Sequence, residues 1–97
     1  MITKFQQKVY NVVKRIPAGR VMTYAAVAKA VGKPKTVRAV GNALNKNNFR
    51  DVPCHRVIRS DGKAGGYNRG TKKKIKLLLR EGIKIKNGKI INGRYHS

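Results

Sequence analysis

Apolar side chains near the start of the chain recur at steps of three or four residues. The positions with this spacing are Ile2, Phe5, Val9, Val12, Val13 and Ile16. Such spacing places the side chains on one face of an α-helix. Thr3 is a suitable N-terminal cap, and Pro17 followed by Gly19 interrupts the pattern. We therefore expect an amphipathic helix over residues 4–15.

Two shorter helical segments follow, separated by a turn that contains glycine. Thr23 can cap the first, which is expected from Tyr24 to Val31 and ends at Gly32. Pro34 suits the first turn of the next helix, expected over residues 34–45. Its apolar stripe consists of Val37, Val40 and Leu44. The pair is a candidate helix-turn-helix with residues 34–45 as the recognition helix, although small helical hairpins without a DNA role share this pattern.

The second half of the chain alternates loops with short apolar segments. Residues 52–58 form a short apolar run, and residues 61–70 contain too much glycine for a regular element. A helix is expected from about Thr71 to Glu81, and the alternation on either side of Asn87-Gly88 predicts a β-hairpin. The expected fold class is mainly α, a small winged-helix-like domain with a helix-turn-helix and a short β-hairpin. Residues 1–97 are expected to form a single domain.

Charge narrows the class of partner. The 97 residues contain 24 Lys and Arg against 3 Asp and Glu, a formal net charge of +21, and 40% are hydrophobic. Such a chain can build one core and attracts polyanions, so nucleic acid is the leading expected partner. Basic residues occur in every segment rather than on one long amphipathic helix, which disfavours a membrane. No apolar run suits a membrane span or a signal peptide, so an intracellular, cytoplasmic protein is expected.

The single cysteine lies in the most unusual segment of the sequence. Cys54 has no partner for an intramolecular disulfide and too few neighbours for a zinc site, so neither a metal nor a cofactor is expected. His55 and Arg56 make its surroundings electropositive, which favours the nucleophilic thiolate. A lone cysteine in an apolar run is also often a small buried hydrophobe. Adjacent side chains of an extended strand point to opposite faces, so Cys54 and His55 would then need a turn or a water to interact.

Glu81 is the only glutamate in the chain, and its position is unfavourable. It lies at the C-terminal end of a predicted helix, where the helix dipole disfavours negative charge. A His or Arg partner in the core would stabilise it there, and a carboxylate that orients a catalytic imidazole has this chemistry. The alternative is an exposed carboxylate paired with Lys84 or Arg80.

Motifs along about two-thirds of the chain carry a family resemblance. In chain order they are PAGRVMTYAAVA at 17–28, RAVGNAL at 38–44, Asn47, PCHRVI at 53–58, GGYN at 65–68 and LLLREG at 77–82. Together they resemble the C-terminal, active-site domain of the O6-alkylguanine-DNA alkyltransferases, also called methylated-DNA–protein-cysteine methyltransferases. Full-length members usually carry an N-terminal domain as well, so the chain is expected to be the active-site domain standing alone.

The resemblance implies a catalytic role for particular residues. Cys54 matches the cysteine that accepts the alkyl group, and His55 matches the histidine that deprotonates it through a water molecule. Glu81 matches the glutamate that completes the Glu–His–water–Cys chain. Asn47 matches the asparagine that braces the turn between the recognition helix and the active-site segment.

The resemblance also implies how the base and the duplex are bound. Arg38 matches the arginine that fills the gap left by a flipped nucleotide, and Tyr24 matches the tyrosine that helps to swing it out. The guanine pocket is expected to include the backbone of Val57 together with Tyr67 and Asn68, where a serine is common in the family. Family members bind the minor groove with this helix-turn-helix. The residues expected at the DNA are Thr23, Lys35, Arg38, Ala39, Gly41, Asn42 and Asn45.

The implied function is direct DNA repair in a single turnover. The alkyl group of O6-alkylguanine, mainly O6-methylguanine, in double-stranded DNA would move to Cys54 after nucleotide flipping. The protein is expected to act as a monomer. One alternative is a noncatalytic alkyltransferase-like binder of damaged bases, a group that typically replaces the cysteine. The other is a plain winged-helix DNA-binding protein with an inert buried thiol.

Overall fold

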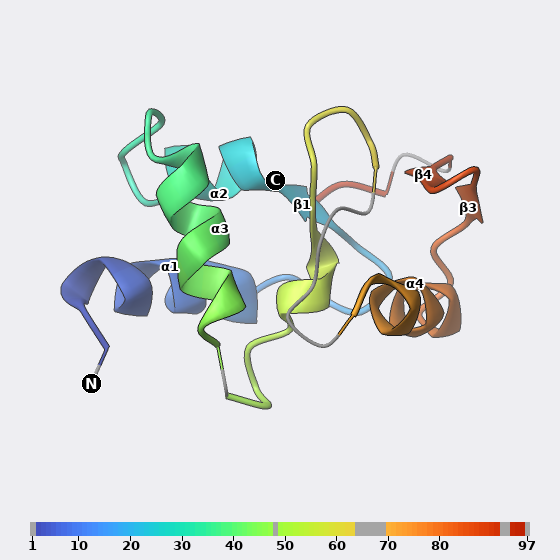
Figure 1. The fold of residues 1–97 in the computed structure, drawn as a ribbon, viewed down its shortest axis with the longest axis horizontal. Coiled ribbons are helices and arrows are strands. Elements are labelled where there is room, and N and C mark those ends of the chain that lie inside the picture. The colour runs from blue at the N-terminus through green and yellow to red at the C-terminus, as the bar shows by residue number, and fades with distance from the viewer. Residues whose placement is uncertain (1, 48, 64–69, 92–93, 97) are drawn as a thin grey trace.

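Helices account for most of the regular structure in the computed structural model, which describes residues 2–47, 49–63, 70–91 and 94–96 (Figure 1). The helices are α1 (Lys4–Lys14), α2 (Tyr24–Ala30), α3 (Val37–Asn45), the 3₁₀ turn η1 (Cys54–Arg56) and α4 (Thr71–Arg80). The strands are β1 (Met22–Thr23), β2 (Val57–Ile58), β3 (Ile85–Lys86) and β4 (Lys89–Ile90). The expected mainly helical fold class is confirmed, and no described helix is long and apolar enough to cross a membrane.

Helix α1 begins with the predicted cap. The Thr3 hydroxyl accepts a hydrogen bond from the Gln6 backbone N–H at 3.0 Å, and the Gln6 side chain accepts from the Thr3 N–H at 2.8 Å. This reciprocal pair satisfies two N–H groups at the helix start. The buried face of α1 carries Val9, Tyr10 and Val13, as the apolar spacing predicted.

Helices α1, α2 and α3 enclose the larger of two hydrophobic clusters, on one side of the molecule in Figure 1. The Tyr10 hydroxyl donates to the Ala43 carbonyl at 2.7 Å and so joins α1 to α3 through a buried bond. The Thr23 hydroxyl accepts from the Ala26 N–H at 3.0 Å and caps α2, as expected. This packing holds α3 against α1 and α2.

The third helix starts later than predicted. It begins at Val37 rather than at Pro34, because the intervening residues form a separate turn. In that turn both the backbone N–H and the hydroxyl of Thr36 donate to the Lys33 carbonyl, at 3.0 and 2.6 Å. The turn leaves Pro34 outside the helix.

Strands β1 and β2 connect the two halves of the molecule. They pair in parallel, with Met22 opposite Val57 and Thr23 opposite Ile58. This pairing sets the start of α2 beside the segment that contains the cysteine. A segment near the C-terminus lies beside the residue before β1, since the Val21 N–H donates to the Arg94 carbonyl at 2.9 Å.

Helix α4 and the β3–β4 hairpin form the other side of the molecule in Figure 1. Their cluster is made of Val21, Ile58, Leu78 and Ile83, with Ile85 and Ile90 packed against it. The predicted hairpin turn is present, with Asn87 and Gly88 both at positive φ, as a type I′ turn requires. The hairpin packs on the core like a small wing. The turn η1 lies between α3 and α4 (Figure 1), and its Cys54 belongs to the larger cluster.

Candidate active site

Cys54 lies in a 3₁₀ turn rather than in the extended segment that the apolar run suggested. The Arg56 N–H donates to the Pro53 carbonyl at 2.9 Å, and the Val57 N–H donates to the Cys54 carbonyl. Pro53 fits this turn because it needs no N–H donor there. Because the segment is a turn, the side chains of Cys54 and His55 do not alternate between opposite faces as they would in a strand. The cysteine is only 8% exposed.

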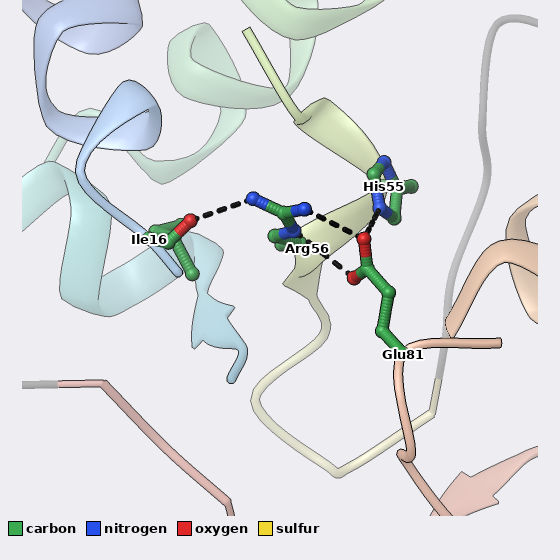
Figure 2. Close-up of polar contacts among 4 residues, drawn as sticks. All are labelled: Ile16, His55, Arg56 and Glu81. Atoms are coloured by element: carbon green, nitrogen blue, oxygen red, sulfur yellow. Dashed lines mark hydrogen bonds and ion pairs between the residues drawn. The ribbon is translucent and has the colours of Figure 1, made fainter. Parts of the chain in front are cut away.

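Glu81 pairs with two residues of this turn (Figure 2). Its carboxylate accepts from Arg56 through Nε at 3.0 Å and Nη2 at 2.6 Å, and lies 3.1 Å from His55 Nε2. The alternative of an exposed carboxylate paired with Lys84 or Arg80 is wrong, since the Glu81 side chain is only 16% exposed. The carboxylate lies at the end of α4, as expected, and Arg56 supplies the compensating charge.

The protonation states of this cluster follow from burial and hydrogen bonding. Burial raises the pKa of Glu81, but the hydrogen bonds from Arg56 and His55 outweigh it and hold that pKa below its ordinary value. Burial lowers the pKa of His55, against the opposing effect of Glu81. His55 is therefore neutral at neutral pH. Because an ionised carboxylate only accepts hydrogen bonds, Nε2 carries the proton and Nδ1 is the acceptor.

Arg56 has a second task that sequence reasoning missed. Its Nη1 donates to the Ile16 carbonyl at 2.8 Å, just beyond the end of α1. Figure 2 shows the guanidinium between Ile16 on one side and Glu81 on the other. One planar guanidinium thus links three segments that are distant in sequence. The PCHR motif was the available signal, but it was interpreted only as an electropositive surrounding for the thiol.

Asn47 spans the loop that leads to the cysteine. It is 4% exposed, its Nδ2 donates to the Val52 carbonyl at 3.0 Å, and its Oδ1 accepts from the Phe49 N–H at 2.9 Å. The amide therefore replaces missing backbone partners at both ends of this loop. Its position suits the bracing role that the resemblance implies.

A buried lysine next to the turn was not predicted. Lys74 on α4 is 0% exposed, and its Nζ donates to the Val57 carbonyl at 2.7 Å and lies 5.7 Å from the centre of the Tyr24 ring. Burial lowers its pKa to about 8. The available signal was spacing, since Lys74 precedes the buried Leu78 by four residues and so shares its helix face.

The residues expected to hold guanine are distributed around this lysine. The Val57 N–H donates within the turn, and the Val57 carbonyl accepts from Lys74. Tyr24 is half-buried, and burial raises the pKa of its hydroxyl. Tyr67 and Asn68 lie outside the described residues.

Two separate hollows adjoin these groups. Cys54 and His55 line a cavity of about 400 Å³ whose wall also includes Asn47 and Arg50. Tyr24 lines another cavity of about 360 Å³ with Arg59. The structure therefore places the thiol and the tyrosine around the β1–β2 pair but on different cavity walls.

Most of the expected DNA contacts lie on the outer face of α3 or just before it. The exposed members of that set are Lys35, Arg38, Ala39, Asn42 and Asn45. Gly41 and Thr23 are half-buried, and Thr23 is also engaged as the α2 cap. Lys35 belongs to the turn before α3 and not to the helix. Spacing of three and four residues from Arg38 to Asn45 makes this one continuous helix face.

Comparison with known proteins identifies the family. The protein-family model described as "6-O-methylguanine DNA methyltransferase, DNA binding domain" matches residues 4–83 of this chain. The chain belongs to this family. The match confirms the membership that the motifs indicated, and the family description names DNA binding for this domain.

Curated relatives of the family share close to half of the aligned residues. The methylated-DNA–protein-cysteine methyltransferase of Methanothermobacter thermautotrophicus is 49% identical over 85 residues, which are 86% of this chain and 47% of that protein. The bifunctional transcriptional activator/DNA repair enzyme Ada of Escherichia coli is 46% identical over 80 residues, 81% of this chain and 23% of Ada. The chain therefore spans less than half the length of either relative.

Solved structures of the family agree with the fold. Mycobacterium tuberculosis OGT in complex with DNA matches with a TM-score of 0.81 and 41% identity over 84% of this chain and 51% of that one. S. pombe Atl1, in complex with damaged DNA containing O6-carboxymethylguanine, matches with a TM-score of 0.79 and 37% identity over 89% of this chain and 83% of Atl1.

The buried charge of Lys74 predicts an unusual pH dependence of stability. The folded-state pKa of about 8 lies below the ordinary value of 10.5, so the unfolded chain binds more protons between these values and stability gains with rising pH. Lys74→Met should remove this gain, and the exposed Lys76→Met on the same helix should keep it. Urea unfolding at pH 7.5 and about 10 measures the difference. The same pH dependence in Lys74→Met and the wild type would show that Lys74 is not a buried cation.

Proposed function

We propose that this chain is the active-site domain of a single-turnover DNA repair protein. It transfers the alkyl group of O6-alkylguanine, mainly methyl, from double-stranded DNA to Cys54. The observation that carries the proposal is the Glu81 carboxylate that holds a neutral His55 next to the only cysteine of the chain, in a turn that lines a cavity. A purely structural thiol needs no such carboxylate and imidazole beside it.

The chemistry is a displacement at the alkyl carbon. His55 accepts the thiol proton at Nδ1 through a water molecule, and Glu81 stabilises the imidazolium that forms. The Cys54 thiolate attacks the alkyl carbon, so that a C–S bond forms and the bond from that carbon to O6 breaks. The electron pair stays with guanine, which takes up one proton. A thioether on Cys54 is stable, so each molecule acts once.

The electrostatics of the cluster suit this sequence of steps. A histidine that is neutral at neutral pH can accept a proton, and an ionised Glu81 favours the protonated form once it appears. Both pKa values lie below their ordinary values, which leaves His55 as a neutral base and Glu81 as its ionised partner at neutral pH. Arg56 keeps the carboxylate ionised and fixed in place.

The duplex would be bound through α3. The exposed face from Arg38 to Asn45 offers small and polar side chains, and the net charge of +21 supplies attraction to phosphates. An alkyl group on O6 is out of reach of a thiol within stacked DNA, so the nucleotide has to leave the helix. Arg38 would fill the gap and Tyr24 would contact the extruded base. The DNA complexes of Mycobacterium tuberculosis OGT and S. pombe Atl1 support this use of the fold.

A second candidate function is binding of damaged DNA without transfer. The likeness to S. pombe Atl1, whose complex contains O6-carboxymethylguanine in DNA, favours damage binding whether or not transfer follows. The fold alone does not separate the two functions. The thiol does, because a protein that only binds damaged DNA has no need of a cysteine in the same turn as a histidine held by a carboxylate.

Loss of the thiol should separate chemistry from binding. Cys54→Ser should abolish alkyl transfer while leaving DNA affinity nearly unchanged, because the thiolate does the chemistry and phosphate contacts supply the binding. Intact mass after incubation with an oligonucleotide containing O6-methylguanine should show a gain of one methyl group in the wild type only. A wild type that binds this DNA without gaining mass would favour the second candidate. Equal loss of folding and binding in Cys54→Ser would make the cysteine structural.

The partners of the thiol should show a pH-dependent defect. His55→Gln and Glu81→Gln should slow single-turnover transfer strongly at pH 7 and less at pH 9, where a reaction assisted by a general base depends less on that base. Asp61→Asn, which removes an exposed acid, is the control and should keep the wild-type profile. Circular dichroism checks that each variant is folded. A defect of equal size at both pH values would mean that the two residues only hold the structure.

Arg38, which is proposed to fill the gap left by the flipped nucleotide, should matter for duplex DNA and not for a free base. Arg38→Ala should slow repair of duplex DNA far more than reaction with free O6-benzylguanine, which needs no flipping. Lys35→Ala should weaken DNA binding modestly and lower the salt slope by about one unit. Single-turnover rates on both substrates, with 2-aminopurine beside the lesion, report transfer and unstacking. Equal slowing on the free base would assign Arg38 another role.

A further inference from the structure

The cavity at the thiol has an apolar wall as well as charged groups. Its volume is about 400 Å³. The apolar part of the wall comes from Phe49, Val52, Pro53 and Leu77. Methylene groups of a longer alkyl chain can therefore lie against this wall.

The charges on the cavity wall do not balance. Lys14 pairs with Asp51 at 3.2 Å, and Arg56 pairs with Glu81 behind the wall at 2.6 Å. His55 is neutral at neutral pH, because burial lowers its pKa. Among the described residues of the wall, Arg50 is the one cation with no acidic partner within ion-pair distance. The cavity thus carries a net positive charge from an exposed guanidinium.

We propose that this cavity is a subsite for alkyl adducts that carry a negative charge, and that Arg50 binds their carboxylate. The inference rests on the alkyl transfer to Cys54 proposed above and names a substrate class for it, the O6-carboxyalkylguanines. A guanidinium is suited to this because its parallel N–H groups match the two oxygens of a carboxylate.

The chemistry of a charged adduct makes such a residue necessary. The attacking thiolate and the carboxylate of a carboxymethyl group are like charges that come within a few bond lengths in the transition state, which disfavours attack. A cation beside the carboxylate offsets this repulsion. The step itself is unchanged: the thiolate forms a C–S bond to the methylene carbon, the bond from that carbon to O6 breaks, and guanine takes the electron pair and a proton. The product is S-carboxymethylcysteine at position 54.

A test without DNA uses two reagents that differ only in charge. Iodoacetate and iodoacetamide both alkylate a thiolate at a methylene carbon with loss of iodide, and Cys54 is the only cysteine to react. Arg50→Gln should lower the iodoacetate rate relative to the iodoacetamide rate by about tenfold, the effect of losing one charge-assisted hydrogen bond. Lys46→Gln removes an exposed cation of the neighbouring helix end that does not line the cavity, and should leave the ratio unchanged. A similar fall of the ratio in both variants, or in neither, would overturn the proposal.

A second test uses oligonucleotides with O6-methyl, O6-carboxymethyl or neutral O6-carbamoylmethyl guanine. Single-turnover transfer, followed by intact mass, should slow in Arg50→Gln for the carboxymethyl adduct alone. Slowing of all three substrates alike would make Arg50 a phosphate contact and overturn the subsite. Absence of transfer from O6-methylguanine in the wild type would contradict the proposed function, and the reagent ratio would still decide the role of Arg50.

Discussion

The carboxylate of Glu81 holds the two halves of the molecule in register. It lies at the end of α4 and accepts from His55 and Arg56 in η1, while Arg56 also reaches the Ile16 carbonyl beyond α1. Gly19 approaches the same corner so closely that a Cβ there would lie 3.2 Å from the Glu81 carbonyl oxygen. A half-buried carboxylate is tolerated only with compensating donors, so these segments must meet in one arrangement for the charge to be stable. Removal of one partner would leave the other charge uncompensated in the core.

The position of the thiol follows from that constraint. Glu81 fixes His55 and Arg56, and because Cys54 is in the same 3₁₀ turn, its position is fixed as well. Val57, which follows the turn, is held to α4 because its carbonyl accepts a hydrogen bond from Lys74. The site therefore lies between α3 and α4 and is held in place from both sides, with Cys54 packed in the larger hydrophobic cluster. Rigid support of this kind is what a displacement reaction needs, because small errors in the attacking distance are costly.

The sequence predicted the elements whose signals are local and missed those that depend on distant contacts. Helix α1, the Thr23 cap and the β3–β4 turn follow from spacing, capping and turn chemistry within a few residues. The sequence did not predict that α3 starts only at Val37, because the competing turn through Thr36 has no strong sequence signal. Burial of Lys74 and the choice of Arg56 as partner of Glu81 depend on which segments the fold brings together. The roles expected for the site residues rest on the motif resemblance. The contacts of Glu81 with His55 and Arg56 could be found only from the structure.

The short parallel pairing of β1 with β2 would allow one small domain both to bind a duplex and to act on a base, as the proposed function requires. Thr23 caps α2 and lies opposite Ile58, so the helix-turn-helix begins within one strand spacing of the turn that bears the cysteine. Cys54 belongs to the same hydrophobic cluster as Val40 and Leu44 of α3, so in the proposed function the thiol lies close to the helix that binds the duplex. The positive charge spread over every segment would attract phosphates without selecting a sequence, and selection of the lesion would then depend on the cavity wall. Arg50 and the neutral His55 share that wall, so the residue proposed to select the substrate and the residue proposed to activate the thiol face the same cavity.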